Sequence, residues 1–300
     1  MFNKEKILKS PRLCKALFGM SYDEIKKLIS TFSLCLIEHR YKLHPKRQRK
    51  VGGGRKGDLP TDEDKLLFIL MYLKVYPTLD VLSVLSDHQR SKCGDSVQLL
   101  LPVLEATLGR KLVLPARKIN DLEEVFRLCP GLKDIFIDGT ERPVQRPRNP
   151  KKQRKLYSGK KKKTTRKNIV ISDEKNKIRY LSPTKSGRRH DKRLTDKFDI
   201  PRRIPPNITA WIDTGFQGMQ KDHSNTQMPK KATKNHPLTE EEKQNNRTIA
   251  GIRVLSEHAI AGFKRFKAAS DIYRNKLPNM DDLMTEVCVG LQNFHLEQTT

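Results

Sequence analysis

The chain has 300 residues, enough for one large domain or two ordinary ones. Its 61 Lys and Arg against 34 Asp and Glu give a formal charge of +27, which is self-repelling in a folded protein unless a polyanion is the partner. Nucleic acid is the expected partner, and a merely basic soluble protein is the alternative. A membrane role is disfavoured, because the longest apolar run, Leu66–Leu73, is too short to span a bilayer.

The first ten residues and the cysteines indicate the compartment. Residues 1–10 are charged and lack an apolar segment, so no signal peptide is visible. The five cysteines are scattered and never form a C-x-x-C pair, which argues against a zinc site or a disulfide framework. These features predict a reducing, cytoplasmic setting.

The sequence predicts helical structure in residues 1–42. Tyr22–Leu36 carries an apolar stripe at helical spacing, and Ser21 with Glu24 forms a capping-box pattern at its start. Residues 44–57 contain six Lys or Arg and a run of three glycines, which predicts a flexible basic linker. This linker either lies along a DNA backbone or is a solvated loop.

Three further helices are predicted before residue 110. Thr61 is an N-cap for a helix that carries the apolar face Leu66–Val75, a second helix covers 79–85, and a polar turn leads to a third over 95–108. This spacing indicates a helix-turn-helix, with an ordinary helical bundle as the alternative. Pro102 and the few basic side chains of the third helix argue against its reading bases.

Two short apolar strands each deliver an aspartate. Ile135–Ile137, after a predicted helix over 121–128, ends in Asp138 and stops on Gly139. The run 210–212 ends in Asp213 in the same way. A carboxylate at the rim of a buried strand is costly to keep charged unless something pairs with it.

The segments between these strands complete a sheet. Arg146–Lys167 holds twelve Lys or Arg in 22 residues and no acid, then alternating residues 168–172 and 177–182 around a turn predict a hairpin. A helix over 190–198 precedes the second aspartate strand, and 226–231 is a possible edge strand. The order strand, hairpin, helix, strand is that of a ribonuclease-H-like sheet, in which the two strand ends lie side by side. It predicts an α/β fold with such a mixed sheet flanked by helices over 131–300, preceded by an all-α domain over 1–130.

A long helix supplies the third carboxylate. Thr239 and Glu242 form a capping box for a helix expected to run to about residue 272, and 280–296 is a last amphipathic helix. On a helical wheel Arg253, Glu257 and Lys264 fall within about 40° of one another, at the border of the buried stripe. The competing acids lack this strand-end or border placement and are interpreted as structural, or as supports of the three carboxylates; they are Asp134, Glu141, Asp191 and Asp271.

Taken in order, these motifs resemble a known family. The set is Asp138-Gly-Thr, Asp213-Thr-Gly-Phe-Gln-Gly and Arg253-x3-Glu257-x6-Lys264, with His190-Asp191 among the flanking features. It is similar to the DDE transposases of bacterial insertion sequences, of the IS5-like group, over about residues 132–295. The N-terminal helices resemble the helix-turn-helix part of that family.

The resemblance implies a site and its partners. Asp138, Asp213 and Glu257 would be the catalytic residues and would hold two Mg²⁺ ions, with Mn²⁺ as a substitute. The partner would be double-stranded DNA, as terminal inverted repeats and as target, bound by a homo-oligomer in the bacterial cytoplasm on the nucleoid. The residues expected to contact DNA are Arg253, Lys264, Lys160, Lys161, Lys162, Arg166 and Lys167.

Two other functions stay open from the residues. One is a non-catalytic or repurposed DNA-binding protein, which predicts salt-sensitive DNA binding without metal-dependent cutting. The other is a different ribonuclease-H-like nuclease, for instance one that acts on DNA junctions. The three acids and the Arg-x3-Glu-x6-Lys pattern favour transposition.

Overall fold

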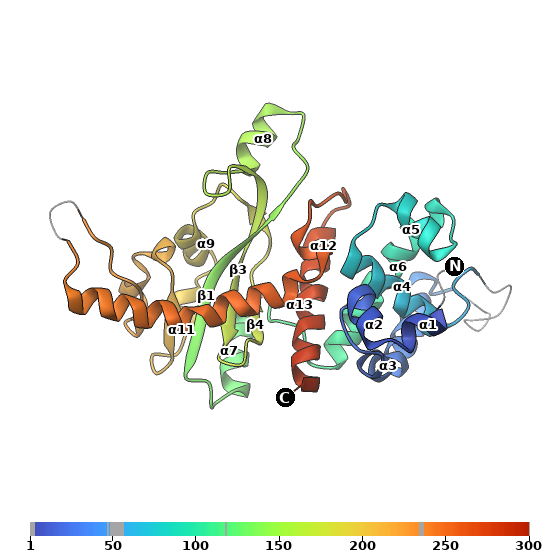
Figure 1. Cartoon of the computed structure of the whole chain (residues 1–300), viewed down its shortest axis with the longest axis horizontal. Helices are drawn as coiled ribbons and strands as arrows, with labels where there is room; N and C mark the ends of the chain where they lie inside the picture. Colours follow the sequence, from blue (N-terminus) through green and yellow to red (C-terminus); the bar gives the residue numbers. More distant parts are fainter. Residues whose placement is uncertain (1–3, 47, 49–56, 118, 234–236, 300) are drawn as a thin grey trace. The chain divides into compact units, whose positions relative to one another are not determined.

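A computed structural model describes residues 4–46, 48, 57–117, 119–233 and 237–299 (Figure 1). The chain forms two compact units. The first contains residues 1–114, 263–271 and 276–300, and the second contains residues 115–262 and 272–275. None of the described helices combines the length and the apolar character needed to cross a membrane.

The first unit is helical. Its central helix α6 packs against α3, α13, α5 and α4. Its helices are α1 (Lys4–Leu8), α2 (Pro11–Phe18), α3 (Tyr22–Leu43), α4 (Asp62–Val75), α5 (Leu79–Ser86), α6 (Arg90–Arg110), α12 (Lys267–Ser270) and α13 (Met280–Thr299).

Local capping explains where these helices begin. Ser21 and Glu24 form the predicted capping box of α3, and Thr61 caps α4 through its side chain. Helix α6 begins at Arg90, so the expected polar turn over 86–94 is shorter than predicted. Most of the predicted linker over 44–57 lies outside the described residues.

The second unit combines a sheet with helices. Its strands run in the order β2-β3-β1-β6-β7, with β4 and β5 also paired to β3. Its elements are α7 (Ile119–Leu128), β1 (Asp134–Pro143), α8 (Pro150–Leu156), β2 (Tyr157–Ser158), β3 (Lys163–Asp173), β4 (Ile178–Leu181), β5 (Lys185–Ser186), α9 (Asp191–Lys197), α10 (Ile200–Arg203), β6 (Thr209–Ile212), β7 (Thr226–Gln227) and α11 (Glu240–Lys264), which ends in the first unit.

The sheet is mixed. β1 pairs antiparallel with β3 and parallel with β6, while β3 and β4 form the predicted hairpin. Such a curled mixed sheet flanked by helices is compatible with a ribonuclease-H-like fold. The edge strand expected over 226–231 is reduced to the two residues of β7.

One face of this sheet builds the core of the second unit. Ile135 and Ile137 of β1 lie on that face, because alternate residues of a strand share a side. Side chains from α7, α9 and α10 cover it, among them Leu122, Leu194 and Ile200. The even-numbered residues of β1, including Asp138, therefore project from the opposite face.

Two predicted element ends are wrong. β1 does not stop at Gly139 but continues to Pro143, because residues 138–143 pair with β3 after the parallel pairing with β6 ends. The long helix ends at Lys264 rather than near 272, and α12 follows as a separate turn. Phe266 lies between these two helices and is fully buried. Its ring packs closely on Gly19, where an added Cβ would be 2.7 Å from the ring of Phe266.

Candidate active site

Asp138 and Asp213 lie at neighbouring strand ends. The last residues that pair in the parallel β1–β6 ladder are Ile137 and Ile212. Asp138 follows Ile137 and Asp213 follows Ile212 in the sequence, so both carboxylates lie at the same edge of the parallel strand pair. The prediction that these two strand ends meet is confirmed.

Asp138 is largely buried and lies near other charged side chains. Burial raises the pKa of Asp138 above its usual value, and the negative charge of Asp213 acts in the same direction. The Gly139 N–H, Arg253 and Lys160 act in the opposite direction and favour the ionised form. The two carboxylates are therefore close enough to repel, and two cations reach the same place.

The backbone orients each carboxylate. The Gly139 N–H donates to Oδ1 of Asp138 at 2.6 Å, and the Thr214 N–H donates to Oδ1 of Asp213 at 2.6 Å. The Thr214 hydroxyl is a second, longer donor to Asp213, at 3.3 Å. The glycine after Asp138 and the 3₁₀ turn after Asp213 thus hold the two side chains locally.

Helix α11 brings Arg253 to this edge but leaves Glu257 exposed. Nη1 of Arg253 lies 3.8 Å from Oδ1 of Asp213, and its side chain is 17% exposed. Glu257 follows one turn later on the same helix. Among the described residues, no group of three or more His, Cys, Asp or Glu side chains is arranged to hold a metal ion. The structure therefore groups Asp138, Asp213 and Arg253, and does not bring Glu257 into a ligand cluster.

The aspartate pair has the chemistry of a divalent-cation site. Carboxylate oxygens are hard ligands of the kind that Mg²⁺ prefers, and Mg²⁺ takes few of them and keeps several waters. A cation between Asp138 and Asp213 would relieve their repulsion and the cost of burying Asp138. The two aspartates fit such an ion, and further ligands would come from water, DNA or Glu257.

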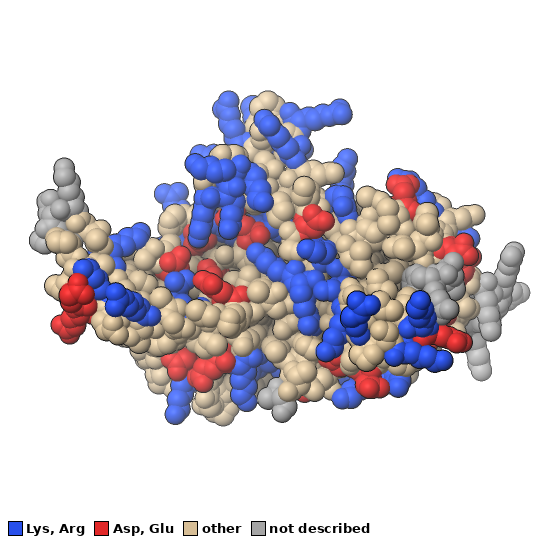
Figure 2. All heavy atoms as spheres, in the orientation of Figure 1, with Lys and Arg blue, Asp and Glu red and all other residues tan. Residues whose placement is uncertain are grey.

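A basic arm lies beyond the strand ends of the second unit. It consists of α8, β2 and the turn into β3, and α8 stands clear of the sheet (Figure 1). Lys and Arg side chains gather over it in the space-filling view (Figure 2). Lys160, Lys161 and Lys162 are exposed in the β2–β3 turn, where they present their ammonium groups to solvent.

Three other predicted DNA contacts have different surroundings. Arg166 lies over the ring of Tyr273, with 5.9 Å between the guanidinium carbon and the ring centroid. Lys167 differs from expectation, because its side chain is only 6% exposed and its ammonium pairs with Glu141 and Asp191. A lysine held in this way does not face a DNA backbone. Lys264 is the last residue of α11 and belongs to the first unit.

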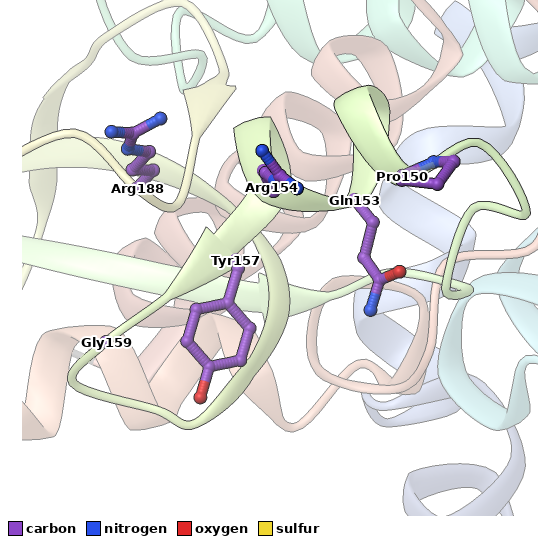
Figure 3. A pocket seen from close by; sticks show the side chains of 6 residues that line it. All are labelled: Pro150, Gln153, Arg154, Tyr157, Gly159 and Arg188. Atoms are coloured by element: carbon purple, nitrogen blue, oxygen red, sulfur yellow. The ribbon is translucent and has the colours of Figure 1, made fainter.

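The arm also carries a hollow of about 680 Å³ (Figure 3). It is lined by Pro150, Gln153, Arg154, Tyr157, Gly159 and Arg188. Sequence reasoning identified this segment as basic but did not identify the hollow. Arg188 comes from beyond β5, and only the tertiary fold brings it beside Tyr157.

Comparisons with known proteins identify relatives of this chain. Residues 137–293 match the model of the family described as DDE superfamily endonuclease. The chain is 28% identical over 250 residues to a probable transposase for insertion sequence element IS702 from Microchaete diplosiphon, a match that covers 83% of this chain and 86% of that protein. No solved structure matches the chain.

Proposed function

The chain belongs to the DDE superfamily endonuclease family, and on that premise we propose a transposase whose active centre is formed by Asp138, Asp213 and Glu257. The proposed reaction begins with hydrolysis of a phosphodiester at the terminal inverted repeats of a mobile element. The 3′-hydroxyl released in that step then attacks a phosphodiester of the target DNA.

One observation carries the proposal. Ile137 and Ile212 are partners in the parallel register of β1 and β6. Asp138 and Asp213 come directly after them, so the two carboxylates share one edge of the sheet. When bound there, a pair of Mg²⁺ or Mn²⁺ ions would activate the nucleophile and stabilise the leaving oxygen. Glu257 is proposed to complete the ligand set once DNA occupies the site.

Basic residues would hold the DNA at this centre. Arg253 lies 3.8 Å from Asp213 and would bind a phosphate next to the reacting one. Lys160, Lys161 and Lys162 would follow the backbone along the arm, since each neutralised phosphate releases counterions. Arg166 and Lys264 stay proposed as further phosphate contacts.

The first unit is proposed to recognise the element ends. Helices α4, α5 and α6 follow one another with short turns, as a helix-turn-helix requires, and one of them would enter the major groove. Joining two ends of an element requires at least two active centres, so a homo-oligomer on DNA is proposed as the active form. Its place in the cell would be the nucleoid.

The test uses a plasmid that carries the DNA flanking the gene on both sides. Cleavage with Mg²⁺ should fall by on the order of 100- to 1,000-fold in Asp138→Asn, Asp213→Asn and Glu257→Gln, since several kcal/mol of transition-state stabilisation are removed. Matched controls are Asp23→Asn, whose carboxylate is 85% exposed on α3, and Glu241→Gln, in the first turn of α11. Undiminished cleavage by Asp138→Asn would refute the proposed centre.

A second candidate is a non-catalytic DNA-binding protein. The observation in its favour is that Glu257 is exposed and that no three-carboxylate group is found among the described residues. This candidate predicts binding of the same DNA that falls steeply with salt, with no cutting in Mg²⁺ or Mn²⁺.

A further inference from the structure

A buried ion cluster lies behind the two aspartates of the proposed site, on the other face of β1. Nζ of Lys167 is 3.1 Å from Oε1 of Glu141 and 2.9 Å from Oδ1 of Asp191. The three side chains are 6%, 4% and 13% exposed respectively. Lys167 also donates to the carbonyl of Arg189, and Thr165 donates to the second oxygen of Glu141 at 2.6 Å. A cation buried with two carboxylates is held in one position.

This cluster lies behind Asp138 rather than beside its carboxylate. Gly139 and Glu141 share one face of β1, because alternate residues of a strand point the same way, and Asp138 points to the other. Glu141 pairs with Lys167 in the β1–β3 register, so the cluster is fixed to the sheet. Asp191 is consequently a support from the reverse face and not a third ligand next to Asp138.

The carboxylate of Asp191 lies against the residue after Asp138 and the second residue after Asp213. A Cβ placed on Gly139 would be 2.7 Å from Oδ1 of Asp191, and a Cβ placed on Gly215 would be 3.3 Å from its Oδ2. One side chain therefore lies against the β1 backbone just after Asp138 and against the turn just after Asp213. Those two segments also supply the N–H groups that orient the aspartates.

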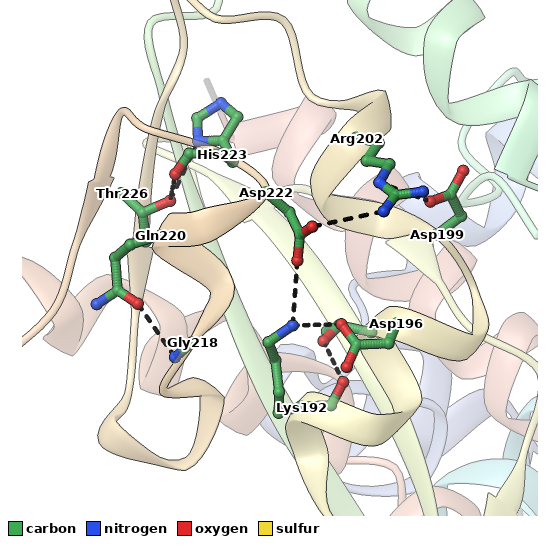
Figure 4. A network of polar contacts seen from close by, with 10 residues as sticks. Lys192, Asp196, Asp199, Arg202, Gly218, Gln220, Asp222, His223 and Thr226 are labelled. Carbon is green, nitrogen blue, oxygen red and sulfur yellow. Dashed lines mark hydrogen bonds and ion pairs between the residues drawn. The ribbon is translucent and has the colours of Figure 1, made fainter.

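Lys192, the next residue of α9, contacts a later part of the segment that follows Asp213. Lys192 pairs with Asp196 on its own helix, and its Nζ is 3.3 Å from Oδ2 of Asp222 in the segment that follows β6 (Figure 4). Its Cε would be 3.5 Å from a Cβ on Gly218. The first turn of α9 thus fixes the chain after Asp213 at two points, Asp191 at the start and Lys192 beyond it.

We propose that Asp191 is a positioning residue that sets the spacing of Asp138 and Asp213 for divalent-cation binding. This inference rests on the proposed function, since it assumes that the two aspartates hold the ion. Binding constellations need their ligands held to within about 0.5 Å, and supporting groups outside the ligand shell provide that constraint. Loss of such a group typically weakens metal affinity by about 10- to 100-fold.

The experiment measures Mn²⁺ binding to the full chain by titration calorimetry in the absence of DNA, together with thermal unfolding without metal. Asp191→Asn keeps the size of the side chain and removes its charge, and we expect affinity to fall by about 10- to 100-fold. The matched control is Asp173→Asn on β3, which also removes a buried, ion-paired carboxylate but lies against neither Gly139 nor Gly215. It should change affinity by less than about twofold.

A second variant leaves every charged residue in place, and it tests the positioning role of Asp191 if Asp191→Asn does not fold. Gly215→Ala places a methyl group 3.3 Å from Oδ2 of Asp191 and should also weaken Mn²⁺ binding. Its control is Gly131→Ala, where an added Cβ meets nothing within 4 Å.

The outcomes separate this inference from the proposed function. Weaker Mn²⁺ binding by Asp191→Asn and Gly215→Ala, with both controls unchanged, supports it. If Asp138→Asn loses Mn²⁺ while folded Asp191→Asn and Gly215→Ala bind as the unaltered chain does, the positioning role is overturned and the proposed centre stands. If Asp138→Asn and Asp213→Asn bind Mn²⁺ normally, both ideas fail.

Discussion

Nη1 of Arg253 lies 3.8 Å from Oδ1 of Asp213, which ties helix α11 to the strand end that carries the second aspartate. The Arg253 side chain is mostly buried, at 17% exposure, whereas the Asp213 side chain is 32% exposed. An arginine in this place neutralises part of the charge of the aspartate pair and is within reach of a phosphate brought to it.

Replacing Arg253 should therefore cost more than replacing another arginine of the same helix. We expect Arg253→Gln to lower the rate of DNA cleavage by about tenfold or more, because a charge-assisted contact contributes about 1.5–3 kcal/mol. Arg247→Gln, an equal change of charge at an exposed position of α11, should have little effect. Equal losses in the two variants would mean that only net charge matters.

The lysines of the arm should control the salt dependence of DNA binding. Each phosphate contact contributes about 0.9 to the slope of log affinity against log salt, so Lys160→Gln, Lys161→Gln and Lys162→Gln together should reduce it by about 2.7. Fluorescence anisotropy over a salt series measures this slope.

The control for the arm is a triple variant of exposed lysines elsewhere in the second unit: Lys175, Lys197 and Lys221. The role of the arm is contradicted if the control triple lowers the slope as much as the arm triple does.

The helical unit should lose stability in acid through Glu24. Burial acts to raise the pKa of Glu24, but hydrogen bonds from His295 and the Ser21 backbone outweigh it and hold the pKa below its usual value. Because the folded pKa is depressed, this contribution to stability is complete above the unfolded pKa of about 4.3 and disappears as the pH falls through the folded value.

Glu24→Gln should accordingly lower the free energy of unfolding by about 1–3 kcal/mol at pH 7 and flatten its dependence on pH below about 4.3. Urea unfolding at several pH values measures both effects. Glu5→Gln, at an exposed position of α1, should behave as the unaltered chain does. An unchanged acid limb in Glu24→Gln would contradict the assignment.

Gly187 should not tolerate a side chain. A Cβ at this position would be 1.8 Å from Oγ1 of Thr165 and 2.9 Å from its carbonyl oxygen, and that hydroxyl is the donor to Glu141. We expect Gly187→Ala to reduce the free energy of unfolding by about 1–3 kcal/mol, since overpacking displaces the backbone. Gly159→Ala, where the space is open, should be close to neutral in the same unfolding measurement.

Local chemistry made many elements predictable. The capping boxes of Ser21 and Thr239 mark the starts of α3 and α11, and the apolar triplet before Asp138 marks the first part of β1. The order strand, hairpin, helix, strand between the two aspartates predicted neighbouring strand ends, and the parallel pairing of β1 with β6 confirms them. These signals act over a few residues, and so they can be read from the chain directly.

Element ends and buried partners depended on distant residues. β1 extends past Gly139 because β3 offers a partner as far as Pro143, and α11 ends early because the core of the helical unit takes up Phe266. The basic residue Lys167 reads as a DNA contact in the sequence, yet two carboxylates from β1 and α9 bury it.

Residue types and their spacing establish the chemistry available at the candidate site: two aspartates at strand ends, an arginine and a glutamate on one helix, and a large excess of positive charge. Which of these groups meet depends on the fold. It joined Asp138, Asp213 and Arg253, left Glu257 exposed, and set Asp191 against the glycines beside both aspartates. The physical reason is that strand register and close packing fix distances between residues far apart in the chain, whereas propensity and spacing constrain only neighbours.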